Sequence, residues 1–409
     1  MTATHPSSQA FEHGLSPKRL WLLIITIAAM SAFAPLATDV YLPAFPQLTS
    51  EFNATDAAAQ LTLTASFLGI MIGQLVFGPM SDSFGRRRLV LITSIVTIFA
   101  TLACAFAPSM GFLIGSRLVL GILGGGGIVI GRAVAADIVK GPEAARFFSV
   151  LMSITMIAPL VGPIVGGVLL DLTNTWRSSF FFLAVFCALI VIGIALFIPE
   201  TLPKERRHAG GLGELGRGAA SMMRDRIFLG YAITQIFAFG ALFAYLASSS
   251  FLFQEKFGMS PTMYSFTFSG IATAIILVGF WNRKAVLTRS VRGILMWSLG
   301  LSALGSIILI PIMATSFASL WLIIPILLVV IGTRATIGAN AMALALERAL
   351  YVGTASAILG ALTFGGAIVD APLLAVLPFD TGVTMAVVMA ICSVLAFAST
   401  AFLTREKSA

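Results

Sequence analysis

The sequence predicts an all-α polytopic membrane protein in which twelve transmembrane helices form two six-helix halves. Its 409 residues are 58% hydrophobic and only 10% charged, whereas soluble domains are about 25% charged. The apolar residues gather in runs of about 20, the length of a helix that crosses a bilayer. One long polar connection divides these runs into two equal sets. These observations argue against a soluble globular protein.

The apolar runs follow one another along the whole chain. A transmembrane β-strand would be about half as long and would alternate polar and apolar residues, so the runs predict helices. They are residues 20–42, 57–79, 89–107, 111–134, 146–170, 178–198, 227–250, 261–281, 292–312, 319–342, 353–377 and 383–403.

The polar connection PETLPKERRHAGGLGELGRGAASMMRDR follows the sixth run. Two equal halves joined by a polar linker are typical of a duplicated transporter architecture. The predicted divisions are a cytoplasmic tail at 1–19, a first six-helix half at 20–198, a cytoplasmic linker at 199–226, a second six-helix half at 227–403 and a cytoplasmic tail at 404–409.

The basic residues predict how the helices are oriented. If the N-terminus is cytoplasmic, 20 of the 25 Lys and Arg fall in cytoplasmic connections or tails, and only Arg177 and Lys256 fall on the other side. Because Lys and Arg accumulate in cytoplasmic connections, we expect a multi-pass protein of the cell (inner or plasma) membrane with both termini in the cytoplasm. Topology then accounts for the net charge of +8, and we expect no nucleic-acid partner.

The cysteines and histidines do not predict a metal site. Cys104, Cys187 and Cys392 lie in apolar runs, where free thiols pack as small hydrophobic groups. The three His lie in the N-terminal tail or the linker, and no spacing of His, Cys or carboxylates is typical of metal ligands. We therefore expect no bound metal.

A charged residue inside a transmembrane helix is a candidate for function, because its burial in the bilayer costs several kcal/mol. Asp39 lies in the outer half of the first run, and Arg117 lies early in the fourth, at a similar predicted depth. An ion pair or a water-bridged pair between them is geometrically possible. Burial disfavours a charged carboxylate and a nearby guanidinium favours it, so such a pair suits proton coupling. The alternative is a static pair that fixes helix packing.

Three further charged residues lie inside predicted spans. Arg132 lies near the inner end of the fourth span, where a cavity role and an extension toward lipid phosphates are both open. Arg334 in the tenth run and Asp370 in the eleventh differ too much in predicted depth to pair directly, and each either lines a polar cavity or is satisfied locally. Core packing equally explains the remaining cavity candidates. These are Tyr41, Met156, Phe239 and Tyr245.

The stretch GPMSDSFGRRR concentrates charge between the second and third runs. Its Gly-Pro pair is expected to end the second span, with the glycine of the pair permitting close helix approach, and its second glycine is expected to allow a tight turn. The acid then lies at the inner membrane face, and the arginines hold the loop on the cytoplasmic side. The residues concerned are Gly78, Pro79, Asp82, Gly85, Arg86, Arg87 and Arg88.

A second glycine-rich stretch, APLVGPIVGG, lies inside the fifth run. Its glycines give the helix a thin face, and its prolines favour a kink. Such a helix serves either as a sliding surface between helix bundles or for simple tight packing. The residues are Pro159, Gly162, Pro163, Gly166 and Gly167.

With these motifs the chain resembles twelve-helix drug:proton antiporters of the major facilitator type. GPMSDSFGRR fits the family pattern G-x-x-x-D-x-x-G-R-R, Arg117 with Gly121 fits R-x-x-x-G of the fourth span, and GPIVGG fits the antiporter motif G-P-x-x-G-G of the fifth. TDVYLPAFPQL and PETLPKERR resemble the bicyclomycin- and chloramphenicol-resistance (Bcr/CflA) branch. The resemblance covers essentially the whole chain. It is weaker in the second half, where GFWNRKAVLTRS lacks the Asp and the Gly-Arg-Arg.

The resemblance implies alternating access of two rocking halves, with proton influx driving drug extrusion. Asp39 occupies the position of the branch's membrane-embedded acid, and where some related exporters carry a second acid in the first span this chain has Ser31. Asp82 and Arg86 would form a latch to the second half, near the start of the eleventh span, when the inside is closed. The expected partners are a small drug or metabolite, protons and lipid. The expected protein is a monomer that needs no cofactor beyond the proton gradient.

Two other functions are alternatives to drug export. The same fold supports an uptake symporter for a polar nutrient, but the predicted spans are sparsely polar, which favours an apolar substrate. A membrane enzyme or a receptor-like protein is not expected, because the sequence shows no nucleophile–base pair, metal cluster or large soluble domain.

Overall fold

The computed structural model describes residues 17–138, 142–203, 205, 207, 222, 224–315, 318–347 and 352–405. Every regular element in these ranges is helical, and twelve helical segments are long and apolar enough to cross a membrane. The predicted fold class is therefore confirmed. Most of the predicted tail at 1–19 and of the predicted linker at 199–226 lies outside the described residues.

The first half contains six spans. A short 3-10 turn and a short helix follow the first span and precede the second. The elements are α1 (Pro17–Asp39), η1 (Leu42–Ala44), α2 (Phe45–Glu51), α3 (Asp56–Phe84), α4 (Arg86–Ala105), α5 (Met110–Ile138), α6 (Pro142–Thr173) and α7 (Arg177–Phe197).

The second half also contains six spans, and its fourth and fifth spans are each broken into two helices. The elements are α9 (Arg226–Phe251), η3 (Leu252–Lys256), α10 (Pro261–Ala285), α11 (Val291–Ala314), α12 (Leu320–Gly332), α13 (Arg334–Leu346), α14 (Val352–Thr363), α15 (Gly366–Val376), α16 (Thr381–Ala398) and η4 (Ser399–Leu403).

Polar side chains fix the starts of several spans. Each accepts a hydrogen bond from a backbone N–H of the first turn, which would otherwise be unsatisfied. The capping residues are Thr55, Asp225, Ser260, Ser290 and Asp380. These caps explain why the predicted starts of α3, α9, α10, α11 and α16 differ from the observed ones by two residues at most.

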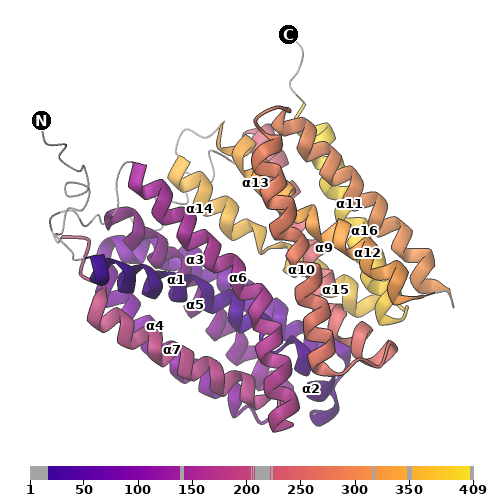
Figure 1. Cartoon of the computed structure of the whole chain (residues 1–409), viewed down its shortest axis with the longest axis horizontal. Helices are drawn as coiled ribbons and strands as arrows, with labels where there is room; N and C mark the ends of the chain where they lie inside the picture. Colours follow the sequence, from indigo (N-terminus) through magenta and orange to yellow (C-terminus); the bar gives the residue numbers. More distant parts are fainter. Residues whose placement is uncertain are drawn as a thin grey trace, which may run out of the picture.

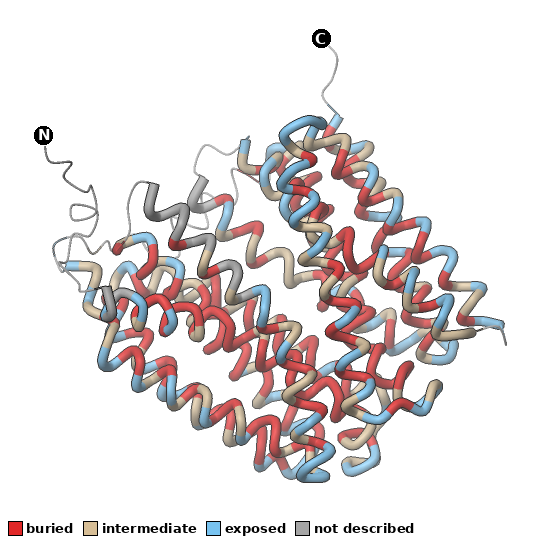
Figure 2. Tube along the Cα trace, viewed as in Figure 1, coloured by how far each residue is buried: buried red, intermediate tan, exposed pale blue. Residues whose placement is uncertain are grey.

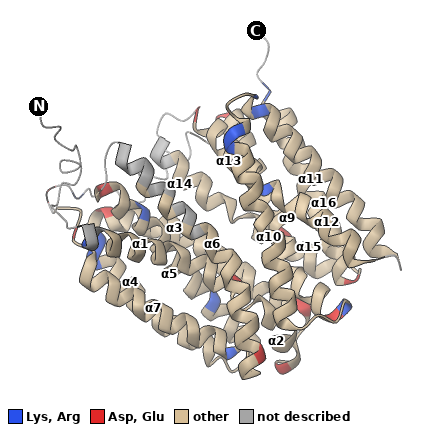
Figure 3. Ribbon diagram, viewed as in Figure 1, with Lys and Arg blue, Asp and Glu red and all other residues tan. Residues whose placement is uncertain are grey.

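The two halves lie side by side as separate helix bundles (Figure 1). We call the end where α1 begins and η4 ends the termini end, and the opposite end the α2 end. Charged residues gather at these two ends and rarely interrupt the middle of the bundle (Figure 3). Outward-facing positions are exposed along the helices (Figure 2), and they include large apolar groups such as Trp297 and Trp321, which are 83% and 89% exposed. A membrane protein presents such groups to lipid.

The end of the second span differs from its prediction. α3 continues through Pro79 to Phe84, and α4 begins at Arg86, so one residue separates the two helices. That residue is Gly85, whose φ of 92° is a conformation that ends a helix and strongly favours glycine. The tight turn predicted at Gly85 is present, but the Gly-Pro pair does not end the span.

Candidate functional site

A central cavity lies between the two halves and has an apolar part. This apolar chamber has a volume of about 200 Å³. Asp39 is the only charged residue among those that line it, which points to an apolar or amphipathic ligand. The lining residues are Pro35, Thr38, Asp39, Phe67, Ile70, Ile128, Pro159, Phe239, Leu242, Tyr245, Leu246, Phe268, Ala272, Ile275, Ile331 and Phe364.

A second, more polar chamber of about 290 Å³ continues toward the termini end. Pro35, Ile128 and Phe364 line both chambers. The polar chamber is also lined by Gln74 and by Arg132, so the guanidinium of Arg132 lies beside the cavity. The remaining lining residues are Ser31, Leu151, Met342, Ser356, Gly360 and Thr363.

Aromatic side chains from both halves meet between the two chambers. Phe67 of α3 stacks on Phe364 with ring centroids 5.6 Å apart. Phe239 of α9 contacts both rings edge-on, with centroids 5.2 Å from each. The cluster lies beside the junction of the two chambers, since Phe364 lines both and the other two rings line the apolar one.

The halves are joined directly at the α2 end. The Gln254 side chain donates a hydrogen bond to the Pro43 carbonyl at 2.9 Å, and the Gln60 side chain donates one to Ser248 at 3.4 Å. The rings of Phe45 and Phe251 lie 5.7 Å apart. Because these contacts close the α2 end while the polar chamber lies toward the termini end, the cavity faces the termini end.

Asp39 is the last residue of α1 and is only 5% exposed. Its Oδ1 accepts a hydrogen bond from the Thr38 hydroxyl at 3.3 Å. The sequence placed Asp39 inside a continuous first span, but α1 ends there and the chain continues as η1 and α2. The carboxyl group therefore lies at a helix end against the apolar chamber.

Arg117 does not form the ion pair that the sequence left open, since no ion pair with Asp39 occurs among the described residues. Arg117 is 1% exposed and donates from Nη1 to the Ala37 carbonyl at 2.8 Å. Its guanidinium lies 4.2 Å from the ring centroid of Tyr41, a cation–π contact. Its Nε and Nη2 have no hydrogen-bond partner. Arg117 thus holds the backbone of α1 beside Asp39.

Tyr41 supports this arginine and does not line the apolar chamber, contrary to its predicted cavity role. It is fully buried, and its hydroxyl shares a 2.7 Å hydrogen bond with Thr62 of α3. The ring of Tyr41 therefore presents a fixed face to the guanidinium of Arg117.

Replacement of Arg117 with lysine is expected to reduce transport about fivefold, because an ammonium group loses the planar stacking on Tyr41 and the directed bond to Ala37. Uptake of a fluorescent substrate into proteoliposomes measures this effect. The matched control is Tyr41→Phe, which keeps the ring and is expected to remain near wild type. Equal losses in both variants would contradict a role for the cation–π contact.

The glycine stretch of α6 packs against both halves. A Cβ added to Gly162 would lie 3.2 Å from Cβ of Asp39, and one added to Gly166 would overlap the carbonyl group of Val40. One added to Gly167 would instead meet Ser265 of α10, in the second half. Pro159 of the same helix lines the apolar chamber, and Pro163 lies within α6. This thin face thus lies where α1, α6 and α10 meet.

The predicted latch residues contact their own half in this structure. The side chain of Arg86 pairs with Asp82 at 2.6 Å and with Asp137 at 3.2 Å, and its backbone N–H donates to Glu200 at 2.9 Å. Arg87 donates to the Ala195 carbonyl at 2.8 Å. Residues 348–351, which lead into the eleventh span, lie outside the described residues, so the bridge to the second half stays a prediction.

Gly78, the first residue of the loop motif, makes no close helix contact in this arrangement. The nearest atom to an added Cβ would be a side-chain carbon of Val129 at 3.6 Å, an ordinary van der Waals distance. The predicted close approach at Gly78 is therefore absent here.

The other cavity candidates separate into three groups. Phe239 and Tyr245 line the apolar chamber, and the Tyr245 hydroxyl is buried without a hydrogen-bond partner. Met156 is 40% exposed and is not part of the lining. Asp370 is fully buried among α9, α15 and α16 and also lies away from the lining.

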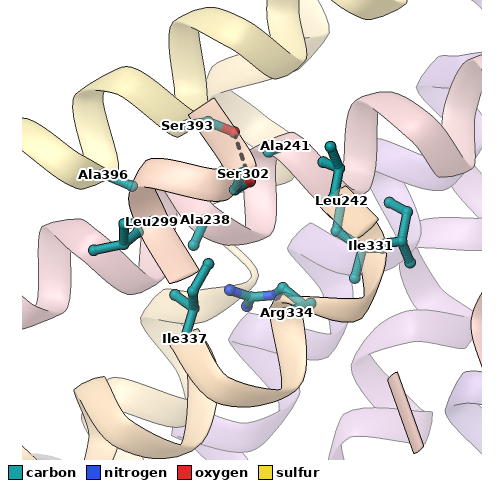
Figure 4. Close-up of a pocket in the computed structure, with 11 residues that line it drawn as sticks. Ala238, Ala241, Leu242, Leu299, Ser302, Ile331, Arg334, Ile337, Ser393 and Ala396 are labelled. Carbon is teal, nitrogen blue, oxygen red and sulfur yellow. Dashed lines mark hydrogen bonds between the residues drawn. The ribbon is translucent and has the colours of Figure 1, made fainter. Parts of the chain in front are cut away.

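Arg334 lines a separate small cavity inside the second half. Its guanidinium extends into the cavity beside Ile337 and Ala238, and the hydrogen-bonded pair Ser302 and Ser393 lines the same cavity (Figure 4). The cavity volume is about 10 Å³, room for about one water molecule. No ion pair joins Arg334 to Asp370 in the part of the chain described.

Comparisons with known proteins agree with this architecture. The sequence profile described as Major Facilitator Superfamily matches residues 27–372. The chain is 32% identical over 405 residues to the uncharacterized MFS-type transporter YdgK of Bacillus subtilis (strain 168), covering 97% of this chain and 98% of that protein. It is 28% identical over 388 residues to a bicyclomycin resistance protein homolog of Haemophilus influenzae, covering 95% and 97%. The crystal structure of a D-xylose-proton symporter aligns with a TM-score of 0.77 at 16% identity, over 95% and 98% of the two chains, a likeness of fold.

Proposed function

The chain belongs to the Major Facilitator Superfamily, and we propose that it exports drugs or similar amphipathic small molecules across the inner membrane in exchange for protons. The observation that carries this proposal is the apolar chamber between the halves, in which Asp39 is the single charged lining residue. Such a chamber suits an apolar substrate, and its acid suits a proton.

The proposed orientation places the termini end in the cytoplasm. It rests on the 20 Lys and Arg that the positive-inside rule assigns to that side. The cavity would then open toward the cytoplasm, which is the state that accepts a substrate for export. The proton gradient supplies the energy, and the proposal requires no cofactor.

The exchange of substrate for a proton follows because both bind at Asp39 in the apolar chamber. A substrate enters through the polar chamber, displaces the aromatic cluster and lies against Asp39 and the Tyr245 hydroxyl. Asp39 is ionised when the substrate binds. After the halves rock outward, a proton from the outside neutralises Asp39 and the substrate leaves. The protonated carrier then returns and releases the proton to the cytoplasm, which leaves Asp39 ionised again. Substrate and proton thus cross in opposite directions.

The direction of coupling tests the proposal. Purified protein is reconstituted in liposomes containing a pH-sensitive dye, with chloramphenicol and bicyclomycin as probe substrates. Antiport predicts that a substrate gradient moves protons the opposite way and that an imposed pH gradient concentrates the drug on the acidic side. Movement of drug and protons in the same direction would establish a symporter, and the absence of any proton flux with transported drug would exclude coupling.

A further inference from the structure

Asp370 is a second buried acid, and the transport cycle above does not use it. It is fully buried in α15. Its Oδ1 accepts a hydrogen bond from the Cys392 thiol at 3.1 Å, and its Oδ2 has no hydrogen-bond partner. No ion pair to Asp370 is formed by the described Lys and Arg residues.

The helices around Asp370 offer no compensating charge. α15 packs against α9, α16 and α3. α16 presents the Cys392 thiol and α9 presents Gly240, where an added Cβ would lie 2.9 Å from Oδ1 of Asp370. The charged residues of α3 are at its two ends, Asp56 and Asp82. An ionised carboxylate would therefore be unsupported at this depth of a membrane protein, and the neutral acid is the favoured form in this state.

The same arrangement of acid and glycine occurs in the first half. There Asp39 belongs to the first span and faces Gly162 of the fifth span, α6. In the second half, Asp370 belongs to the fifth span and faces Gly240 of the first span, α9. In both halves a glycine of one span packs against the side chain of the acid on the other span, at Cβ of Asp39 and at the carboxyl oxygens of Asp370, with the acid and the glycine exchanged. Repeated halves of a transporter commonly place their sites at corresponding positions.

An arginine of the fourth span also lies at a corresponding position in each half. Arg117 of the fourth span lies over Tyr41, which follows α1, at 4.2 Å. Arg334 of the fourth span of the second half lies over Phe239 of α9 at 5.7 Å. Each guanidinium keeps at least one nitrogen without a hydrogen bond. Each half therefore contains an acid facing a glycine and an arginine over an aromatic ring.

The surroundings of Asp370 are connected to the central cavity. Gly240, which encloses the carboxyl group, follows Phe239 of the aromatic cluster. Gly366 of α15 packs directly on the Gly240 backbone, just after Phe364, which lines both chambers. A substrate that displaces Phe239 and Phe364 must therefore disturb the contact between α9 and α15 that shields Asp370 from water.

We propose that Asp370 is a second proton-binding site of the transporter, so that each cycle moves two protons, one on Asp39 and one on Asp370. This inference rests on the proposed antiport. The Asp370 carboxylate takes a proton from water on one side and returns it to water on the other, and no other bond changes.

The ratio of protons to drug tests this inference. The reversal voltage of chloramphenicol transport in proteoliposomes is measured at a series of imposed pH gradients. We expect a ratio of two for the wild type and one for Asp370→Asn. The matched control Cys392→Ser keeps a hydrogen-bond donor beside the acid and is expected to keep the ratio of two. A wild-type ratio of one, or an unchanged ratio in Asp370→Asn, would overturn the proposal, whereas wild type without proton counterflow would overturn antiport itself.

A second measurement covers the case in which Asp370→Asn folds but does not turn over. Infrared difference spectra of the purified protein at neutral pH report the carbonyl band of protonated carboxylic acids. We expect a band that persists in Asp39→Asn and is lost in Asp370→Asn. Persistence of the complete wild-type band in Asp370→Asn would show that Asp370 is ionised and would refute the proposal without any transport.

Discussion

Asp39→Asn is expected to lower gradient-driven export by at least about 100-fold, the scale on which removal of a proton-transferring group acts. Asparagine has the shape of the acid but cannot take up and release a proton. It also leaves the packing against Gly162 and the hydrogen bond from Thr38 nearly unchanged, so the folded protein should persist. Drug accumulation in everted vesicles, normalised to the amount of transporter in the membrane, measures the effect.

Two controls separate proton coupling from packing. Asp39→Glu keeps an ionisable group in the apolar chamber and is expected to retain part of the export, because its extra methylene extends into open volume. Drug binding to Asp39→Asn, measured by calorimetry, should be weaker than in the wild type and should no longer change with pH, because asparagine resembles the protonated acid that releases the substrate. Undiminished gradient-driven export in Asp39→Asn would show that another group carries the coupling proton.

The arrangement of the twelve spans follows from hydropathy alone, because the bilayer requires about 20 apolar residues for each crossing. Span ends were predictable where a polar side chain caps the helix, as at Ser260 and Asp380. They were wrong at α3, where Pro79 lies inside the helix and the glycine geometry of Gly85 ends it. A proline is therefore a weaker stop inside a membrane helix than a glycine that must adopt a positive φ.

The breaks in the tenth and eleventh spans were not predicted. α12 and α13 are separated at Thr333, and α14 and α15 at Phe364 and Gly365. The sequence Phe-Gly-Gly at 364–366 was a usable signal for the second break, because consecutive glycines weaken a helix. At Thr333 no comparable signal exists, and the break depends on how the second half packs.

The site was only partly predictable. The choice of Asp39 as a candidate functional residue followed from the cost of a charge within a span. The contacts of Arg117 did not, because similar depth in the bilayer cannot determine whether a guanidinium reaches a carboxylate, a carbonyl or a ring. The choice of Ala37 and Tyr41 depends on where α1 ends, and that end was predicted incorrectly.

Gly166→Ala is expected to lower transport about 30-fold and the melting temperature by about 5 °C, in line with the 1–3 kcal/mol that overpacking typically costs. The added methyl group would overlap the carbonyl group of Val40, which is backbone and cannot rotate away. α1 and α6 must then separate directly beside Asp39. Transport assays and thermal unfolding followed by a thiol-reactive dye measure both effects.

Alanine substitutions at two other glycines serve as controls for Gly166→Ala. At Gly162 the added methyl group meets Cβ of Asp39 at 3.2 Å, so a smaller loss of transport is expected there. At Gly115 of α5 no atom lies within 4 Å of an added Cβ, and alanine, the better helix former, should leave transport intact and raise stability slightly. If Gly166→Ala instead behaved like Gly115→Ala, α1 and α6 would have to part without cost. The close packing at Gly166 would then contribute neither to stability nor to the transport cycle.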